Sequence, residues 1–197
     1  MSRGERAFNS ILGLSVCSWA ILGYLSELPR PWLVQLVISV VHLCVGFLVL
    51  TRSGVQQHGS FYACVVSIPS LIAAGLVLQW APANWEWPVQ IAFAIFGVWT
   101  VVSLLSLGRS FAVLPALRAT VTRGPYSLVR HPTYLGELLM LGSCSVAAWS
   151  WGSLGLFIGV LLTVGLRIMA EERVLEASPD YIAYREQVRW RLLPGVW

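Results

Sequence analysis

The chain divides into long apolar blocks separated by short polar segments. An α-helix needs roughly 20 consecutive apolar residues to cross a lipid bilayer, and the first four blocks each come close to that length. We therefore predict one membrane-spanning helix for each block. The blocks are Phe8–Leu25, Trp32–Leu50, Phe61–Trp80 and Pro88–Leu107.

Two shorter apolar blocks follow a long polar stretch. They cover Tyr134–Trp149 and Gly152–Ile168 and are joined by the short sequence WSWG, which predicts a helical hairpin. A polar, amphipathic tail begins at Glu171. We predict an all-α integral membrane protein with about five to six transmembrane helices, in which residues 1–110 form a scaffold and residues 111–197 form a cofactor-binding and catalytic region.

The composition supports a membrane location. Hydrophobic residues make up 57% of the chain and charged residues only 11%, whereas a soluble domain has about 25% charged residues. All thirteen basic residues are arginines, and nearly all of them fall on one side of the bilayer if both termini are cytoplasmic. Arginine collects in cytoplasmic loops, so we expect cytoplasmic termini in the cell inner or plasma membrane. We expect no nucleic-acid partner.

Several common types of site are not indicated. The four cysteines are widely spaced in apolar segments and form no CxxC pair, so we expect buried thiols and no metal site. No GxGxxG follows a strand, and the chain has no P-loop, HExxH or GxSxG motif. A nucleotide-like cofactor would therefore need a non-Rossmann pocket.

The polar stretch from Gly124 to Gly136 contains the tripeptide Arg130-His131-Pro132. Proline disfavours helical geometry in the residue before it and often begins a helix, so His131 is expected in a loop at a helix start. The free N–H groups of a helix start suit a carboxylate ligand, and tyrosines flank the loop. The alternative is an ordinary helix start with interfacial aromatic residues.

A second group of ionisable residues lies at the end of the last apolar block. Arg167 and Glu171 are four residues apart, so they share a helix face and can point into a common site. The alternative is that Arg167 extends to the membrane surface and forms an ordinary salt bridge there. Two further ionisable residues lie in apolar blocks. We interpret Glu137 as a first-turn carboxylate favoured by the helix dipole and His42 as a packed histidine, although a functional role is an alternative for both.

Taken together in order, these polar stretches resemble the isoprenylcysteine carboxyl methyltransferase family and its bacterial relatives. That family has a GxY-x4-RHPxYxG run, a hydrophobic hairpin, an R-x3-EE-x2-L segment, a YxxY segment and a final proline. The resemblance covers about residues 105–197. The matching residues are Gly124, Tyr126, Arg130, His131, Pro132, Tyr134, Gly136, Arg167, Glu171, Glu172, Leu175, Tyr181, Tyr184 and Pro194.

The resemblance implies an integral membrane methyltransferase that uses S-adenosyl-L-methionine in a cytoplasmic pocket. It implies catalytic roles for Arg167, which would engage the acceptor carboxylate, and for Glu171 and Glu172. The implied cofactor-binding residues are Arg118, Ala119, Thr120, Val121, Tyr126, Arg130, His131, Pro132, Thr133, Tyr134, Gly136, Glu171, Tyr181 and Tyr184.

The acceptor stays open at this point. The chain resembles the compact prokaryotic form of the family, for which a prenylated protein is not the expected acceptor. A lipophilic, isoprenoid-like acid is the main expectation, and the other acceptors that this form allows are a lipid amine and a small hydrophobic thiol or phenol. The alternatives are a phospholipid N-methyltransferase, a membrane protein similar to the NADPH-dependent sterol reductases, and a non-enzymatic membrane scaffold.

Overall fold

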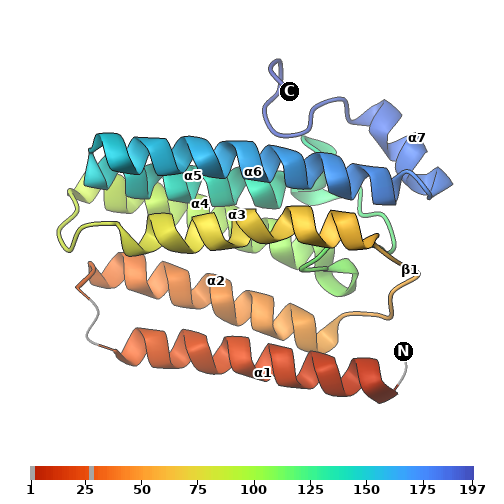
Figure 1. The fold of residues 1–197 in the computed structure, drawn as a ribbon, viewed down its shortest axis with the longest axis horizontal. Helices are drawn as coiled ribbons and strands as arrows, with labels where there is room; N and C mark the ends of the chain where they lie inside the picture. The colour runs from red at the N-terminus through yellow and green to blue at the C-terminus, as the bar shows by residue number, and fades with distance from the viewer. Residues whose placement is uncertain (1–2, 27–28) are drawn as a thin grey trace.

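The computed structural model describes residues 3–26 and 29–197 of the chain. Their fold is almost entirely helical (Figure 1). The α-helices are α1 (Arg3–Leu25), α2 (Trp32–Thr51), α3 (Phe61–Gln79), α4 (Trp87–Leu107), α5 (Pro132–Ala148), α6 (Trp151–Leu175) and α7 (Pro179–Gln187). Short elements complete the fold: the 3-10 helices η1 (Gly108–Ser110) and η2 (Gly124–Ser127), and the antiparallel pair β1 (Gln57–His58) and β2 (Ala116–Leu117).

The prediction of an all-α integral membrane protein is confirmed. Five segments in the described residues are long and apolar enough to cross a membrane, namely α1, α2, α3, α4 together with η1, and α6. Helix α5 has 17 residues, which gives it a length of about 26 Å. It lies among the long helices as a shorter element, and its partner α6 runs on to Leu175, beyond the predicted end at Ile168.

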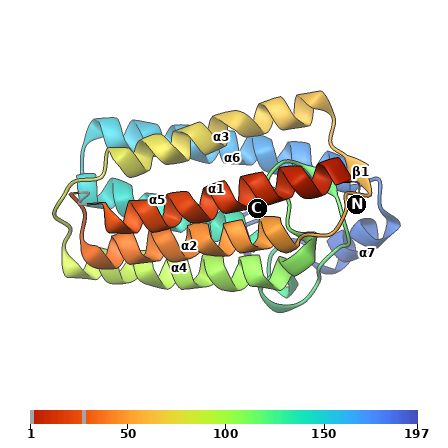
Figure 2. The same cartoon turned by 90° about the horizontal axis from the view of Figure 1, so that it is seen from below.

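Neighbours in the bundle do not follow the order of the chain. Helix α1 packs on α2, α2 packs on α4, α4 packs on α5, and α3 packs on α6. Figure 2 shows α3 beside α6 and away from α2, although α2 and α3 are consecutive in sequence. Helices α2 and α3 therefore pack mainly on other helices and make little direct contact with each other.

Helices α4 and α5 approach each other closely at the start of α5. Gly136 faces Thr100 and Trp99 of α4, and the Trp99 indole Nε1–H donates a hydrogen bond of 2.9 Å to the Pro132 carbonyl. The central core beside this contact is formed by fully buried apolar side chains, among them Phe93, Val160 and Ile168. These contacts hold the first turn of α5 in a fixed position.

The predicted hairpin of α5 and α6 is confirmed. Helix α5 ends where Trp149 adopts a left-handed conformation, with a φ angle of 34°. Helix α6 then begins with a capping box, in which the Ser150 and Ser153 side chains bond to each other's backbone N–H groups. Two hydrogen-bonded helix ends within a few residues explain how the chain reverses so tightly.

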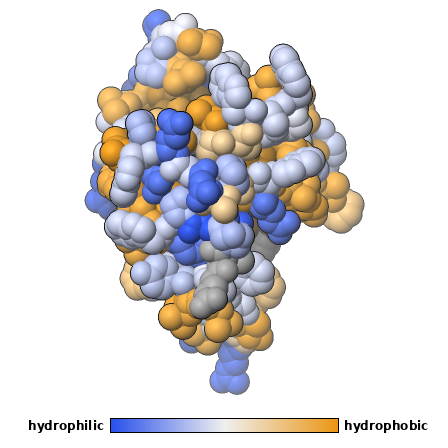
Figure 3. Space-filling model, turned by 90° about the vertical axis from the view of Figure 1, so that its left-hand side faces the viewer, coloured by the Kyte–Doolittle hydropathy of each residue, from blue (hydrophilic) through white to orange (hydrophobic). Residues whose placement is uncertain are grey.

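The two ends of the bundle differ in composition. One end carries η1, η2, the β1–β2 pair, α7 and the C-terminal segment (Figure 1). The opposite end carries the turns before α2, α4 and α6, where Trp80, Trp87, Trp149 and Trp151 are exposed. Figure 3 looks onto this second end, where hydrophilic residues lie among hydrophobic ones. Exposed tryptophans are typical of a membrane interface.

The α4–α5 contact can be tested at Gly136. A Cβ atom there would overlap Thr100 Oγ1 and would lie 2.9 Å from Trp99 Cδ1. We expect Gly136→Ala to destabilise the protein by about 1–3 kcal/mol, measured as a lower unfolding temperature in detergent. Gly155→Ala on α6 is the matched control because its Cβ would meet no atom within 4 Å. Equal unfolding temperatures for the two variants would contradict this packing.

Candidate functional site

A cavity of about 460 Å³ opens among the helices, within the range of roughly 300–1,000 Å³ that is usual for small-molecule sites. Its polar part lies beside η2, the start of α5 and α7, and is lined by Thr120, Tyr126, His131, Tyr181 and Tyr184. Its apolar part extends between α2 and α3. That part is lined by Ile38, Val41, Val45, Leu71, Ala74, Gly75, Leu78 and Phe93.

The loop before α5 is held in place by the C-terminal segment. The backbone N–H groups of Arg130 and His131 donate hydrogen bonds of 2.9 Å to the carbonyls of Trp190 and Arg191. Helix α5 then begins at Pro132, with His131 in a non-helical conformation. The prediction that this tripeptide is a loop leading into a helix is confirmed.

The buried Glu172 carboxylate joins this loop to α7 and the C-terminal segment. Arg130 Nε, His131 Nε2 and the Tyr181 hydroxyl lie 2.9, 3.2 and 3.1 Å from Glu172 Oε1. Arg191 Nε donates to Glu172 Oε2 at 2.8 Å. A buried carboxylate is stable only when its charge is paired and its oxygens are hydrogen-bonded, and these four partners meet that condition.

Buried tyrosines form the wall between α7 and the loop. The Tyr184 hydroxyl donates to the Tyr126 carbonyl at 2.6 Å, and the Tyr126 hydroxyl lies 2.9 Å from Thr133 Oγ1. Burial raises the pKa of Tyr126, Tyr181 and Tyr184 well above the ordinary value of a phenol. Their hydroxyl groups therefore stay protonated across the physiological range, so that Tyr181 and Tyr184 keep donating their hydrogen bonds to Glu172 and to the Tyr126 carbonyl.

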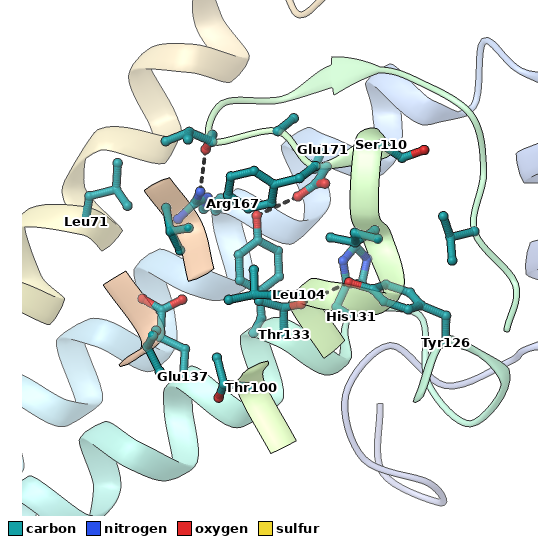
Figure 4. Close-up of a pocket in the computed structure, with 18 of the residues that line it drawn as sticks. Leu71, Thr100, Leu104, Ser110, Tyr126, His131, Thr133, Glu137, Arg167 and Glu171 are labelled. Carbon is teal, nitrogen blue, oxygen red and sulfur yellow. Dashed lines mark hydrogen bonds between the residues drawn. The ribbon is translucent and has the colours of Figure 1, made fainter. Parts of the chain in front are cut away.

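Arg167 and Glu171 of α6 lie near each other at the cavity (Figure 4), and both contact Tyr134 of α5. The Tyr134 hydroxyl donates a hydrogen bond of 2.6 Å to Glu171 Oε2, and the Arg167 guanidinium lies 4.9 Å from the centre of the Tyr134 ring. His131 stacks on the same ring, with a centroid distance of 5.6 Å. The arrangement places a carboxylate, a cation and two aromatic rings around one space.

Arg167 is held by polar groups from two other segments. Its Nη1 donates to Ser70 Oγ on α3 at 3.3 Å, and its Nη2 donates to the Val113 carbonyl at 2.6 Å. The third nitrogen, Nε, is buried and has no hydrogen-bond partner among the described residues. The Nε–H group therefore remains free for an anionic ligand.

Most of the predicted site residues line one cavity. These are Arg118, Ala119, Thr120, Val121, Tyr126, Arg130, His131, Thr133, Tyr134, Arg167, Glu171, Tyr181 and Tyr184. Pro132, Gly136 and Glu172 are not among the lining residues. Pro132 and Gly136 contact α4, and both Glu172 oxygens are bound by other side chains.

Residues 1–110, which the sequence analysis interprets as a scaffold, also contribute to the cavity wall. Helices α2, α3 and α4 supply His42, Gly75 and Thr100 to the cavity wall, together with most of its apolar surface. Glu137 of α5 also lines the cavity. The only sequence signals were the isolated polar residues His42 and Glu137 within apolar helices, because ionisable residues at membrane depth are usually functional.

The Glu172 cluster predicts a specific structural defect. Glu172→Gln would leave Arg130 and Arg191 without a counter-charge, and breaking a buried ion pair costs about 3–5 kcal/mol. We expect a lower unfolding temperature and faster amide hydrogen exchange in residues 179–197. The control is Glu176→Gln, which removes an exposed pair with Arg185 that contributes about 1 kcal/mol or less. Unchanged exchange in Glu172→Gln would show that this cluster does not hold the C-terminal segment.

Comparison with known proteins identifies one family for the region that builds most of this site. Residues 88–178, just under half of the chain, match the family model described as phospholipid methyltransferase. Neither curated proteins nor solved structures gave a significant match. The matched region begins in α4 and includes Tyr126, His131, Tyr134, Arg167 and Glu171. The match indicates a membrane methyltransferase, whereas closer similarity to the isoprenylcysteine carboxyl methyltransferases stays a prediction.

Proposed function

We propose that this protein is an S-adenosyl-L-methionine-dependent methyltransferase whose acceptor is lipophilic and reaches the site from the bilayer. The observation that carries the proposal is the continuity of the cavity. Its polar, tyrosine-lined part and its apolar part between α2 and α3 meet at Tyr134, Arg167 and Glu171. Such a cavity offers a polar environment for a methyl donor and an apolar environment for the chain of a lipophilic acceptor.

The polar part of the cavity fits the chemistry of the donor. S-adenosyl-L-methionine carries an ammonium, a carboxylate, an adenine ring and a sulfonium, and when bound it supplies an electrophilic methyl group. Glu171 would hold the ammonium, and the backbone N–H groups at the start of α5 would hold the carboxylate. Tyr126 and Tyr181 would cover the ring. Thr120 Oγ1 is buried without a partner among the described residues, so it can serve as an additional polar contact.

The residues of this chain would act mainly by positioning. Tyr134 fixes the Glu171 carboxylate through its hydrogen bond. Glu172 holds the loop and α7 in place, which makes it a positioning residue rather than a catalytic one. Arg167 would orient an anionic group of the acceptor through its free Nε–H. Methyl transfer is a direct displacement, so alignment of donor and acceptor supplies much of the rate.

An acceptor would reach the cavity between α2 and α3. These helices pack mainly on other helices, and both contribute apolar residues to the cavity wall. Gly75 of α3 lies in this wall, is exposed, and would leave space for a larger side chain. A lipid chain could therefore pass between α2 and α3 without entering water. The placement of the arginines supports a cytoplasmic orientation for the polar end and both termini.

Two acceptor groups are compatible with Arg167. In carboxyl O-methylation, which the resemblance to the isoprenylcysteine carboxyl methyltransferases favours, the carboxylate bound by Arg167 itself accepts the methyl group. In phospholipid N-methylation, which the family match favours, Arg167 binds the lipid phosphate and a nearby amine accepts the methyl group. Both acceptors carry an anion beside an apolar chain.

Binding measurements separate the methyltransferase from the other functions. We expect the purified protein to bind S-adenosyl-L-methionine and not NADPH in calorimetry. Glu171→Gln should weaken that binding about 10–100-fold, because it removes a hydrogen bond to a charged group. Arg167→Ala should retain donor binding and lose methyl transfer. Binding of NADPH alone would instead favour a reductase, and binding of neither by folded protein would favour a scaffold.

The path between α2 and α3 can be tested by narrowing it. Gly75→Phe should lower methyl transfer to long-chain acceptors at least about tenfold, while affinity for S-adenosyl-L-methionine stays the same. Gly155→Phe is the control because Gly155 is also exposed but does not line the cavity. Equal loss of transfer in both variants would argue against this path.

A further inference from the structure

The Glu137 side chain is an ionisable group in the apolar part of the cavity. It lies three residues after Tyr134 on the same face of α5, and Figure 4 shows Glu137 and Tyr126 on opposite sides of Thr133. Among the described residues, no hydrogen bond or ion pair reaches its carboxylate. A carboxylate in apolar surroundings is costly without a partner, so the missing partner is expected to come from a ligand.

The arrangement around Glu137 leaves specific polar atoms unused. Arg167 is near enough to act electrostatically on Glu137, and its buried Nε has no partner among the described residues. His42 of α2 also lines the cavity, with its Nδ1 2.7 Å from the Ile38 carbonyl. A carbonyl only accepts, so Nδ1 carries the proton, and the Nε2 atom of the neutral ring is an acceptor.

These atoms define the ligand that complements them. Glu137 and His42 Nε2 are acceptors and require hydrogen-bond donors, whereas Arg167 Nε is a donor and requires an anion or another acceptor. A carboxylate ligand offers only acceptors and would leave Glu137 unpaired. A primary amine next to an anionic group offers both kinds of atom.

We propose that Glu137 is the residue that selects the acceptor, by binding the amine N–H groups of a zwitterionic lipid head group whose phosphate is bound by Arg167. This inference rests on the proposed methyltransferase function and assigns its acceptor to the amine class. The ammonium would first transfer one proton to the Glu137 carboxylate. The neutral amine nitrogen then has a lone pair that forms the new N–C bond with the methyl group, while the donor sulfur keeps the electron pair of the broken S–C bond. Glu137 and Arg167 thereby bind the two oppositely charged groups of one head group.

Three single-chain lipids that differ in the head group test the proposal by equilibrium binding to the detergent-purified protein. Lysophosphatidylethanolamine carries an amine and a phosphate, lysophosphatidic acid lacks the amine, and lauric acid offers a carboxylate. Glu137→Gln should weaken lysophosphatidylethanolamine binding about 10–100-fold, leave lysophosphatidic acid binding within about twofold, and strengthen lauric acid binding. Glu86→Gln, an exposed acid before α4, is the control and should change none of these affinities.

Binding of S-adenosyl-L-methionine is measured on every variant. If the unmodified protein does not bind S-adenosyl-L-methionine, the proposed function is wrong. If Glu137→Gln binds S-adenosyl-L-methionine as the unmodified protein does, this variant is folded. If Glu137→Gln does not fold, Glu137→Met replaces it, because methionine suits an apolar wall. With donor binding intact, the proposal fails if the variant weakens both phospholipids equally, if it weakens neither, or if lauric acid binds the unmodified protein more tightly than lysophosphatidylethanolamine.

Discussion

The buried Glu172 carboxylate is the constraint on which the polar half of the cavity depends. Its partners come from the loop before α5, from α7 and from the C-terminal segment, which are far apart in sequence. Helix α7 has only nine residues, too few for a stable isolated helix. Its position on the bundle therefore relies on tertiary contacts, and the same contacts bring Tyr181 and Tyr184 to the cavity.

Glu171 and Glu172, two neighbouring acids of α6, have different roles because their side chains point in different directions. Successive residues of an α-helix point about 100° apart, so Glu171 and Glu172 cannot face the same space. Glu172 faces the loop and α7, where its charge is fully paired. Glu171 faces the cavity, where Tyr134 is its hydrogen-bond partner among the described residues, and so it retains capacity for a cationic ligand. Structural stability and ligand binding are thus divided between adjacent carboxylates.

Sequence reasoning recovered the helices because long apolar blocks leave few alternatives in a bilayer. It also placed Arg130, His131 and Tyr134 at the start of α5, because proline chemistry is local. It could not choose between Glu171 and Glu172, since the rotation of α6 is set by packing on α3 and α5. It treated residues 1–110 as a scaffold, because the separation of α2 from α3 is a tertiary feature. Glu137 was interpreted from the helix dipole alone, although it lines the cavity.

The central claim is that one cavity holds a methyl donor at its polar end and a lipid acceptor at its apolar end. An experimental structure with S-adenosyl-L-homocysteine, the demethylated donor, would test this claim most directly. We predict the ligand between Tyr126 and Tyr181, with its amino group at hydrogen-bond distance, about 3 Å, from Glu171, and its sulfur directed toward Arg167. Binding of the ligand outside this cavity, or direct packing of α2 on α3 that closes the apolar part, would contradict the account.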